Sequence, residues 1–266
     1  MRLKRIFTLL LCICSLSAFA QNWNKKQAAV VLTYDDALHV HLDNAIPALD
    51  ALGLRGTFFL IASSTAFTQR MEEWRKASQK HELANHTLFH PCDGSLPGRG
   101  FVTADYNLAT YSVRRMQDDI KMTNAVLQAV DGKKQHTFAY PCGDTMIGGI
   151  PYLEGIKGDI AAARGVHHEM IQPNTTDLYN MGSYVVNGQS GEELIALVKK
   201  AMETNSLIVF LFHGVGGEHG LNVSLDAHSK LLKFIKENEK KIWNPTFIEA
   251  ADYIKAGGAA KKASAK

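Results

Sequence analysis

Short runs of apolar, often β-branched residues alternate along the chain with longer segments in which apolar residues recur every three or four positions. The short runs predict buried strands, and the longer segments predict amphipathic helices packed against them. The predicted strands are residues 28–33, 55–61, 136–140, 160–166, 181–186 and 206–212, with a closing strand and turn at 246–254. The predicted helices are residues 42–52, 68–80, 113–131, 191–202 and 225–240. Strands that alternate with helices are typical of an α/β fold with a parallel sheet.

Residues 91–111 follow neither period and are rich in glycine and proline. They predict a long loop, and a long loop inside a compact domain more often has a function than not. Phe101, Tyr106 and Tyr111 lie in it. These aromatic side chains would either stack on a sugar or pack the loop against the domain, and the sequence leaves both readings open.

The first 20 residues have the pattern of a secretory signal peptide. Three basic residues precede the apolar run 6–16, and Ala18 and Ala20 match the small-x-small cleavage pattern. The run is too short for a comfortable membrane span of about 20 residues, although an uncleaved signal anchor is the alternative. We expect cleavage after Ala20 and an exported protein, periplasmic or secreted, with no membrane span once the leader is removed.

The rest of the chain reads as one domain, residues 21–256, followed by a tail at 257–266 that we expect to be disordered. In the whole chain 46% of residues are hydrophobic and 21% are charged, which suits a globular protein with a core. The leader holds three of the 29 basic residues and none of the 26 acidic ones. The mature chain is therefore nearly neutral, which argues against nucleic-acid or anionic-membrane partners. We expect a monomer.

Two of the four cysteines, Cys12 and Cys14, would leave with the leader. Cys92 and Cys142 would then remain in a compartment that permits disulfides. A Cys92–Cys142 bridge between two loops is our hypothesis. The alternative is a pair of small buried apolar residues.

Candidate chemistry is concentrated in two short stretches. His86 and His90 stand four positions apart, so on a helical or turn-like backbone both imidazoles can reach one metal ion. Asp35 and Asp36 close an apolar run, where two adjacent carboxylates are costly unless a cation lies beside them. One carboxylate would complete a three-ligand metal set with the imidazoles, and the other would stay free as a base.

The suspected chemical groups all follow apolar strands. Asp35 and Asp36, His86, the turn at residues 140–143 and His213 lie at strand ends or in the loops just after them. Catalytic groups at the carboxyl ends of several strands are the signature of a β/α barrel.

Taken in order, four motifs resemble those of the polysaccharide deacetylase family, the carbohydrate esterases with a NodB-type domain. They are TYDD at residues 33–36, HTLFH at 86–90, AYPCG at 139–143 and FLFH at 210–213. The resemblance covers residues 28–254. It implies a distorted (β/α)7-type barrel forming a single domain, with one divalent metal, preferably Zn²⁺, with Co²⁺ or Ni²⁺ as alternatives.

The resemblance also implies roles for individual residues. Asp36, His86 and His90 would be the metal ligands, Asp35 the general base and His213 the general acid. The turn formed by Tyr140, Pro141 and Cys142 would face the substrate, and the backbone N–H of Cys142 would help to hold the oxyanion.

The chain departs from the family pattern in three places. Ala139 replaces the arginine of the third motif, which normally braces the catalytic aspartate. Arg164, at the end of the strand formed by residues 160–163, is our candidate substitute, and an ordinary surface arginine is the alternative. Cys142 replaces an aromatic residue. The fourth motif is not recognisable. Asp177 is the nearest candidate for a residue that tunes His213, with an ordinary loop acid as the alternative.

The sequence therefore predicts an exported, metal-dependent enzyme that removes O- or N-linked acetyl groups from an oligo- or polysaccharide. The alternative is a glycan-binding protein on a degraded deacetylase scaffold, for which the missing arginine and fourth motif speak. A barrel glycosidase would need two opposed carboxylates, and the neighbours Asp35 and Asp36 make a poor pair for that.

Overall fold

Strand β1 (Ala28–Asp35) is buried along its whole length and lies at the centre of a parallel sheet. The computed structural model describes residues 23–257. The strand order is β7-β4-β3-β2-β1-β9-β8, and β12 pairs with the start of β1. The bounds of these strands are β2 Thr57–Leu60, β3 Glu82–Asn85, β4 Phe138–Ala139, β7 Ala163–Arg164, β8 Tyr184–Val185, β9 Leu207–Phe212 and β12 Ile242–Trp243.

The two edges of this curled sheet approach each other through the segment before β8. An isolated parallel bridge joins Arg164 of β7 to Met181. The N–H of Gly165 donates to the carbonyl of Met181 at 2.8 Å, and β8 then pairs with β9. The sheet thus curls into the distorted α/β barrel that the sequence predicts, with its strand ends gathered at one rim.

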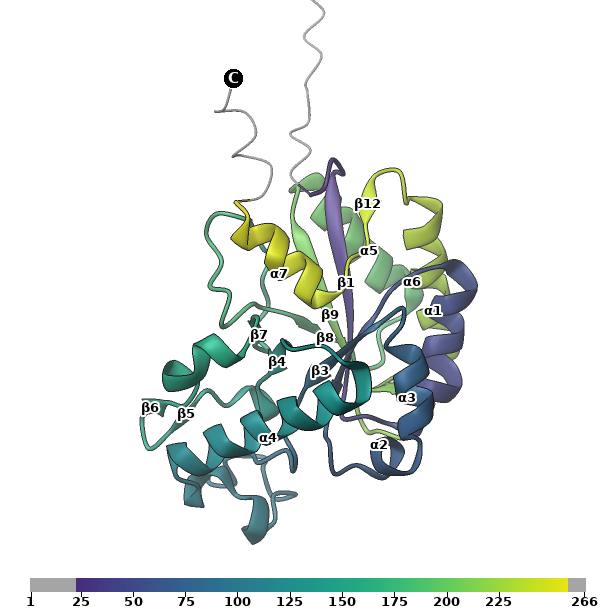
Figure 1. Cartoon of the computed structure of the whole chain (residues 1–266). Coiled ribbons are helices and arrows are strands. Elements are labelled where there is room, and N and C mark those ends of the chain that lie inside the picture. The colour runs from purple at the N-terminus through teal and green to yellow at the C-terminus, as the bar shows by residue number, and fades with distance from the viewer. Residues whose placement is uncertain (1–22, 258–266) are drawn as a thin grey trace, which may run out of the picture.

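Helices surround the curled sheet (Figure 1). Their bounds are α1 Ile46–Leu52, α2 Thr65–Gln69, α3 Met71–Ala77, α4 Val113–Asp131, α5 Gly191–Glu203, α6 Leu225–Glu237 and α7 Phe247–Lys255. A π-helical turn, η1 (His41–Ala45), leads into α1. None of the described helices has the length and apolarity of a membrane span.

Side chains of β1 alternate between two cores, as the period of two in a strand requires. Val30 and Leu32 pack with the outer helices, whereas Ala29 and Val31 face the barrel interior. Asp35 shares the inward parity of Ala29 and Val31, so its carboxylate ends at the rim rather than among the helices. Helix α7 closes the opposite end of the interior, where Phe247 packs edge-on against Phe59 of β2.

The closing strand predicted at residues 246–254 is wrong, because this segment is helix α7. Thr246 accepts a hydrogen bond from the N–H of Glu249, whose side chain bonds back to Thr246. This capping box starts a helix inside an apolar run that otherwise resembles a strand. Strands β3 and β12 of the main sheet were not predicted. The expected leader (residues 1–20) lies outside the described residues, and so do residues 258–266 of the expected tail.

Candidate metal and catalytic site

A cavity of about 590 Å³ opens at the rim where the carboxyl ends of the strands meet. Strand β1 ends with Asp35 at this cavity, and Asp36 follows it. The loop after β3 carries His86 and His90, and His213 directly follows β9. The remaining lining residues are Phe101, Tyr140, Cys142, Val166, Val185, Leu211, His219, Gly220 and Leu221. Segments far apart in the sequence thus form one polar cluster with apolar walls, as ligand sites generally do.

Asp36, His86 and His90 converge on one point. Oδ1 of Asp36 lies 3.5 Å from Nε2 of His86 and 3.7 Å from Nε2 of His90. One ligand atom from each residue lies within 4.8 Å of those of the other two. Two imidazole nitrogens and one carboxylate oxygen form a donor set that suits zinc and related divalent metals.

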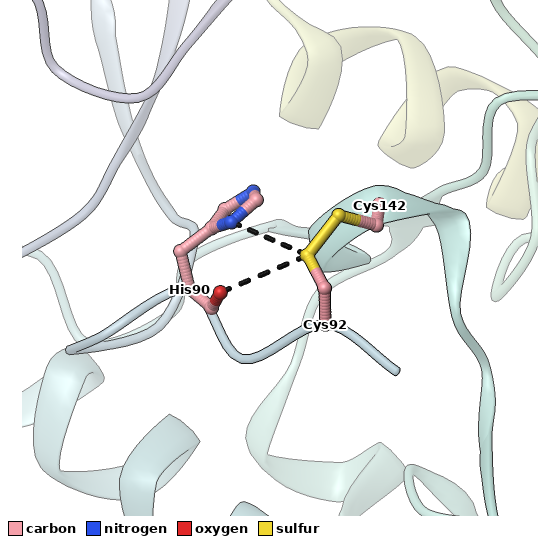
Figure 2. Close-up of side chains that lie close together, drawn as sticks. All are labelled: His90, Cys92 and Cys142. Atoms are coloured by element: carbon pink, nitrogen blue, oxygen red, sulfur yellow. Dashed lines mark hydrogen bonds between the residues drawn. A yellow bond between two sulfur atoms is a disulfide. The ribbon is translucent and has the colours of Figure 1, made fainter. Parts of the chain in front are cut away.

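Hydrogen bonds at the far side of each imidazole favour this arrangement. Nδ1 of His86 lies 2.9 Å from the carbonyl oxygen of Ala139 and must donate its proton there, which leaves the lone pair on Nε2 facing Asp36. Nδ1 of His90 lies 3.5 Å from Sγ of Cys92 (Figure 2). Because that sulfur is in a disulfide and carries no proton, Nδ1 is the donor here too.

The ionisable side chains of this three-residue cluster are shifted toward their neutral forms by burial. Burial, and the neighbouring charge on Asp35, raise the pKa of Asp36. Burial also lowers the pKa of His86 to about 3 and that of His90 to about 4, so both imidazoles are neutral at pH 7. Oδ1 of Asp36 is buried without a hydrogen-bond partner among the described residues. An orphaned carboxylate oxygen facing two neutral imidazoles is what a bound cation would satisfy, so these residues fit a divalent metal.

The backbone around these side chains is held in an uncommon conformation. Asp36 (φ 80°), Thr87 (φ 69°), His90 (φ 53°) and Cys142 (φ 55°) all have positive φ without being glycine. Side chains support the histidine loop, because the N–H of His90 donates to Oγ1 of Thr87 at 2.8 Å. Such conformations persist only where surrounding contacts enforce them, and they cluster at functional sites.

Arg164 lies against Asp35. Its guanidinium donates a hydrogen bond to Oδ2 of Asp35, and both side chains are almost completely buried. Burial alone would raise the pKa of Asp35, but Arg164 and the nearby imidazoles hold it below the usual value. Arg164 thus contacts Asp35 from β7, the strand that pairs with β4, where Ala139 lies. Oδ1 of Asp35 is left without a partner among the described residues.

Cys92 and Cys142 form a disulfide, which confirms that hypothesis (Figure 2). The bond joins the loop after His90 to the short turn that contains Pro141 and Cys142. Arg99 strengthens the same connection: its guanidinium pairs with Asp144 at 2.9 Å and donates to the carbonyl of Cys142 at 3.1 Å. Cys142 and Tyr140 both line the cavity.

The structure brings together most of the predicted site residues but leaves Asp177 apart. Nε2 of His213 lies 3.9 Å from Oδ2 of Asp36. Asp177 instead accepts the N–H of Tyr179 at 2.9 Å within its own turn, and none of its described contacts involves His213. The sequence analysis also missed His219, whose Nε2 lies 3.7 Å from Oδ2 of Asp36. The only signal for it was a histidine in the glycine-rich loop after His213.

The aromatic residues of the long loop differ in their surroundings. Phe101 is two-thirds exposed and lines the cavity, whereas Tyr111 is buried and packs beneath the guanidinium of Arg115. Tyr106 stacks on Phe89 at the surface, with ring centroids 5.2 Å apart. Tyr111 therefore packs the loop against the domain. Phe101 is the aromatic residue of this loop that lines the cavity, where a substrate could contact it.

Comparisons with known proteins agree with the fold and the motifs. The sequence profile of the polysaccharide deacetylase family matches residues 22–147. No curated protein matches the chain in sequence.

Solved structures share the fold across most of the chain. A Mycobacterium smegmatis protein assigned to the polysaccharide deacetylases is 13% identical with a TM-score of 0.59, covering 87% of this chain and 91% of its own. A peptidoglycan deacetylase of Bacillus subtilis is 14% identical with a TM-score of 0.51, covering 89% and 96%. A mutant of a CE4 family pseudoenzyme is 16% identical with a TM-score of 0.52, covering 85% and 67%.

Proposed function

The polysaccharide deacetylase profile matches residues 22–147, and from this premise we propose that the chain is an exported, metal-dependent hydrolase of that family that removes acetyl groups from a glycan. The single observation that carries the proposal is the convergence of Asp36, His86 and His90 beside the arginine-paired carboxylate of Asp35. A ligand set and a separate charged base in one cavity are the two parts that metal-assisted hydrolysis needs.

Asp36, His86 and His90 would hold the metal, which we take to be Zn²⁺, with Co²⁺ or Ni²⁺ as alternatives. When bound, a divalent metal at such a site acidifies water and polarises an acyl oxygen. The disulfide beside His90 and the carbonyl of Ala139 beside His86 would keep both imidazoles turned toward it.

Three groups of the chain would carry the remaining steps. Asp35, kept ionised by Arg164, would accept a proton from the attacking water. The backbone N–H of Cys142, in the turn with Pro141, would donate to the developing oxyanion. His213 would then protonate the departing sugar oxygen or nitrogen, so that acetate and the deacetylated sugar leave.

The cavity walls suit a sugar acetate. Leu211, Val185 and Val166 would face the acetyl methyl group, and Tyr140 and Phe101 offer aromatic surfaces to a sugar ring. Because an acetate ester and an acetamide place the same acyl group over the same residues, we propose one site for O- and N-linked acetyl groups. The expected leader would deliver the protein to glycans outside the cytoplasm.

Acetate release from acetyl-xylan, chitin oligomers and peptidoglycan, with and without a chelator, tests the proposal. We expect release from at least one of the three, loss of release in the chelator and recovery when Zn²⁺ is added back. Chelator-resistant release would contradict the assigned metal. Bound zinc without release from any of the three glycans would contradict the deacetylase.

A second candidate is glycan binding without turnover, because Ala139 stands where the family has its bracing arginine. The contact between Arg164 and Asp35 weakens this candidate. Calorimetric titration with the same glycans distinguishes it: binding of a glycan that is recovered fully acetylated would favour this second function.

A further inference from the structure

His213 has little to fix the orientation of its ring. Its Nδ1 is buried without a hydrogen-bond partner among the described residues. Its main chain is held, because Nε2 of His41 donates to the His213 carbonyl at 2.8 Å, but that bond does not restrain the imidazole. A general acid must point at the leaving group to work, since small errors in position are costly in rate. Something other than a hydrogen bond at Nδ1 has to set this ring.

The imidazole of His219 packs face to face with that of His213. The two imidazoles are stacked, with centroids 4.6 Å apart and planes inclined by 12°. His219 comes from the loop between β10 (Gly214–Val215) and β11 (Asn222–Val223), and it lines the same cavity. Stacking of this geometry restricts the tilt of a ring while leaving its edge, and therefore Nε2, free to face the cavity.

The ring of His219 is itself well anchored. The N–H of Leu221 donates to its Nδ1 at 3.0 Å. Two further bonds brace the loop, from the N–H of Gly217 to Oδ1 of Asn222 at 2.9 Å and from the N–H of Val40 to Oε2 of Glu218 at 2.7 Å. A loop fixed at several points can present an aromatic ring at a constant position.

We propose that His219 is a positioning residue that sets the ring of the general acid His213 by stacking. The role rests on the proposed function, in which His213 protonates the leaving group. His219 would take over the tuning of His213 that we expected from an acid of the unrecognised fourth motif. The candidate acid, Asp177, makes no described contact with His213. His219 acts through the flat face of its ring rather than through proton transfer.

A pair of variants separates the ring from its nitrogen atoms. His219→Phe keeps a flat ring but loses the bond from the N–H of Leu221. His219→Asn removes the ring but can still accept that N–H, because Asn side chains bond the backbone two residues on. His168→Asn is the matched control, since His168 stacks on Tyr184 outside the cavity lining. His213→Ala gives the full loss of the acid.

The kinetic readout is dependence on the leaving group. Alkoxide and amine leaving groups need an acid, and 4-nitrophenolate does not, so the ratio of kcat on a sugar acetate to kcat on 4-nitrophenyl acetate isolates the acid step. His213→Ala should lower this ratio about 100-fold or more. His219→Asn should lower it about 10-fold, whereas His219→Phe and His168→Asn should stay within 2-fold. An unchanged ratio in His219→Asn, or an equal fall in His219→Phe, would overturn the proposal.

A structural readout needs no turnover. Stacking should shift the ring-proton resonances of His213 upfield in the metal-free protein, and the shift should persist in His219→Phe and vanish in His219→Asn. No shift in the wild type would overturn the stacking itself. If the shift behaves as expected but His213→Ala leaves the kinetic ratio unchanged, the acid role in the proposed function is what fails, and the positioning role falls with it.

Discussion

One ionisable side chain lies at the start of strand β3 and another lies just beyond its end, and the two differ in their hydrogen bonding. At the start, Glu82 is buried and fully hydrogen-bonded: Oε2 accepts the hydroxyl of Thr57 and the N–H of Ile248, each at 2.9 Å, and Oε1 accepts the hydroxyl of Thr137. At the other end, His86 faces Asp36, whose Oδ1 has no partner among the described residues.

This difference in hydrogen bonding distinguishes a carboxylate with a structural role, Glu82, from one with a proposed functional role, Asp36. A buried carboxylate that neutral donors surround, as Glu82 is, ties strands and helix α7 together and offers nothing to a ligand. A buried carboxylate that faces acceptor nitrogens, as Asp36 does, is stable only if something positive joins it. Both groups are buried, so burial does not distinguish a functional side chain from a structural one. The presence or absence of hydrogen-bond partners does.

The largest effect should follow from removing a proposed ligand. We expect His86→Ala to weaken metal binding more than about 100-fold, because even the loss of a ligand's outer partner costs about 10–100-fold. Acetate release should become undetectable. Competition with a chromophoric chelator measures the affinity, and Glu82→Gln, at the other end of the strand, should bind metal as the wild type does. Equal affinity in His86→Ala and wild type would contradict the ligand assignment.

Asp35→Asn should separate chemistry from metal binding. The amide keeps the shape of the side chain but cannot accept the proton, so kcat should fall about 1,000-fold, within the usual range for a general base. Metal content, measured by elemental analysis, should stay at the wild-type level because Asp36 and both histidines are intact. A variant that turned over at the wild-type rate would refute the role of Asp35 as base.

The sequence predicts those residues whose roles lie in contiguous motifs. Asp35 with Asp36, and His86 with His90, are neighbours along the chain, so spacing alone brings each pair together. The strand before the aspartates, β1, is a continuous apolar run that the sequence predicts. The strand before the histidines, β3, begins with Glu82 and ends with Asn85, and it was not predicted. The sequence could also propose Arg164 as a substitute brace, but only from its place at a strand end.

Other features depend on contacts between distant segments. Arg164 meets Asp35 across 129 positions of sequence, and no local pattern reports on such a contact. His219 is placed by the loop bonds that also hold Glu218, which composition does not reveal. Helix α7 was missed because its apolar residues resemble a strand, although Thr246 and Glu249 have the spacing of a capping box.

A smaller effect on activity is expected from changing Arg164, which contacts Asp35. Arg164→Lys keeps the positive charge in the barrel but loses the planar fork that orients a carboxylate. We expect kcat to fall about 10-fold with little change in KM, since the base would still be charged but less well aligned. Steady-state kinetics on a sugar acetate measures this. Full activity in Arg164→Lys would mean that charge alone is enough to support Asp35.

The smallest effect on activity should come from Glu82→Gln, and here the comparison predicts a change in stability instead. Burial raises the pKa of Glu82 above its ordinary value of 4.5, against the opposing effect of its three donors. A carboxyl with a raised folded-state pKa favours folding when protonated. Its contribution is therefore fully present below pH 4.5 and is lost as the pH rises through the folded-state value. The glutamine variant has no such dependence.

The free energy of unfolding of Glu82→Gln should therefore rise relative to that of the wild type as the pH rises from 4 to 7.5. Urea denaturation of the metal-free proteins at several pH values measures the difference, and acetate release by the loaded variant should match the wild type. The opposite slope would mean that the three donors stabilise the carboxylate more than burial destabilises it. A loss of acetate release would mean that the charge at the start of β3 acts on the site at its end, and the division between the two ends of the strand would not hold.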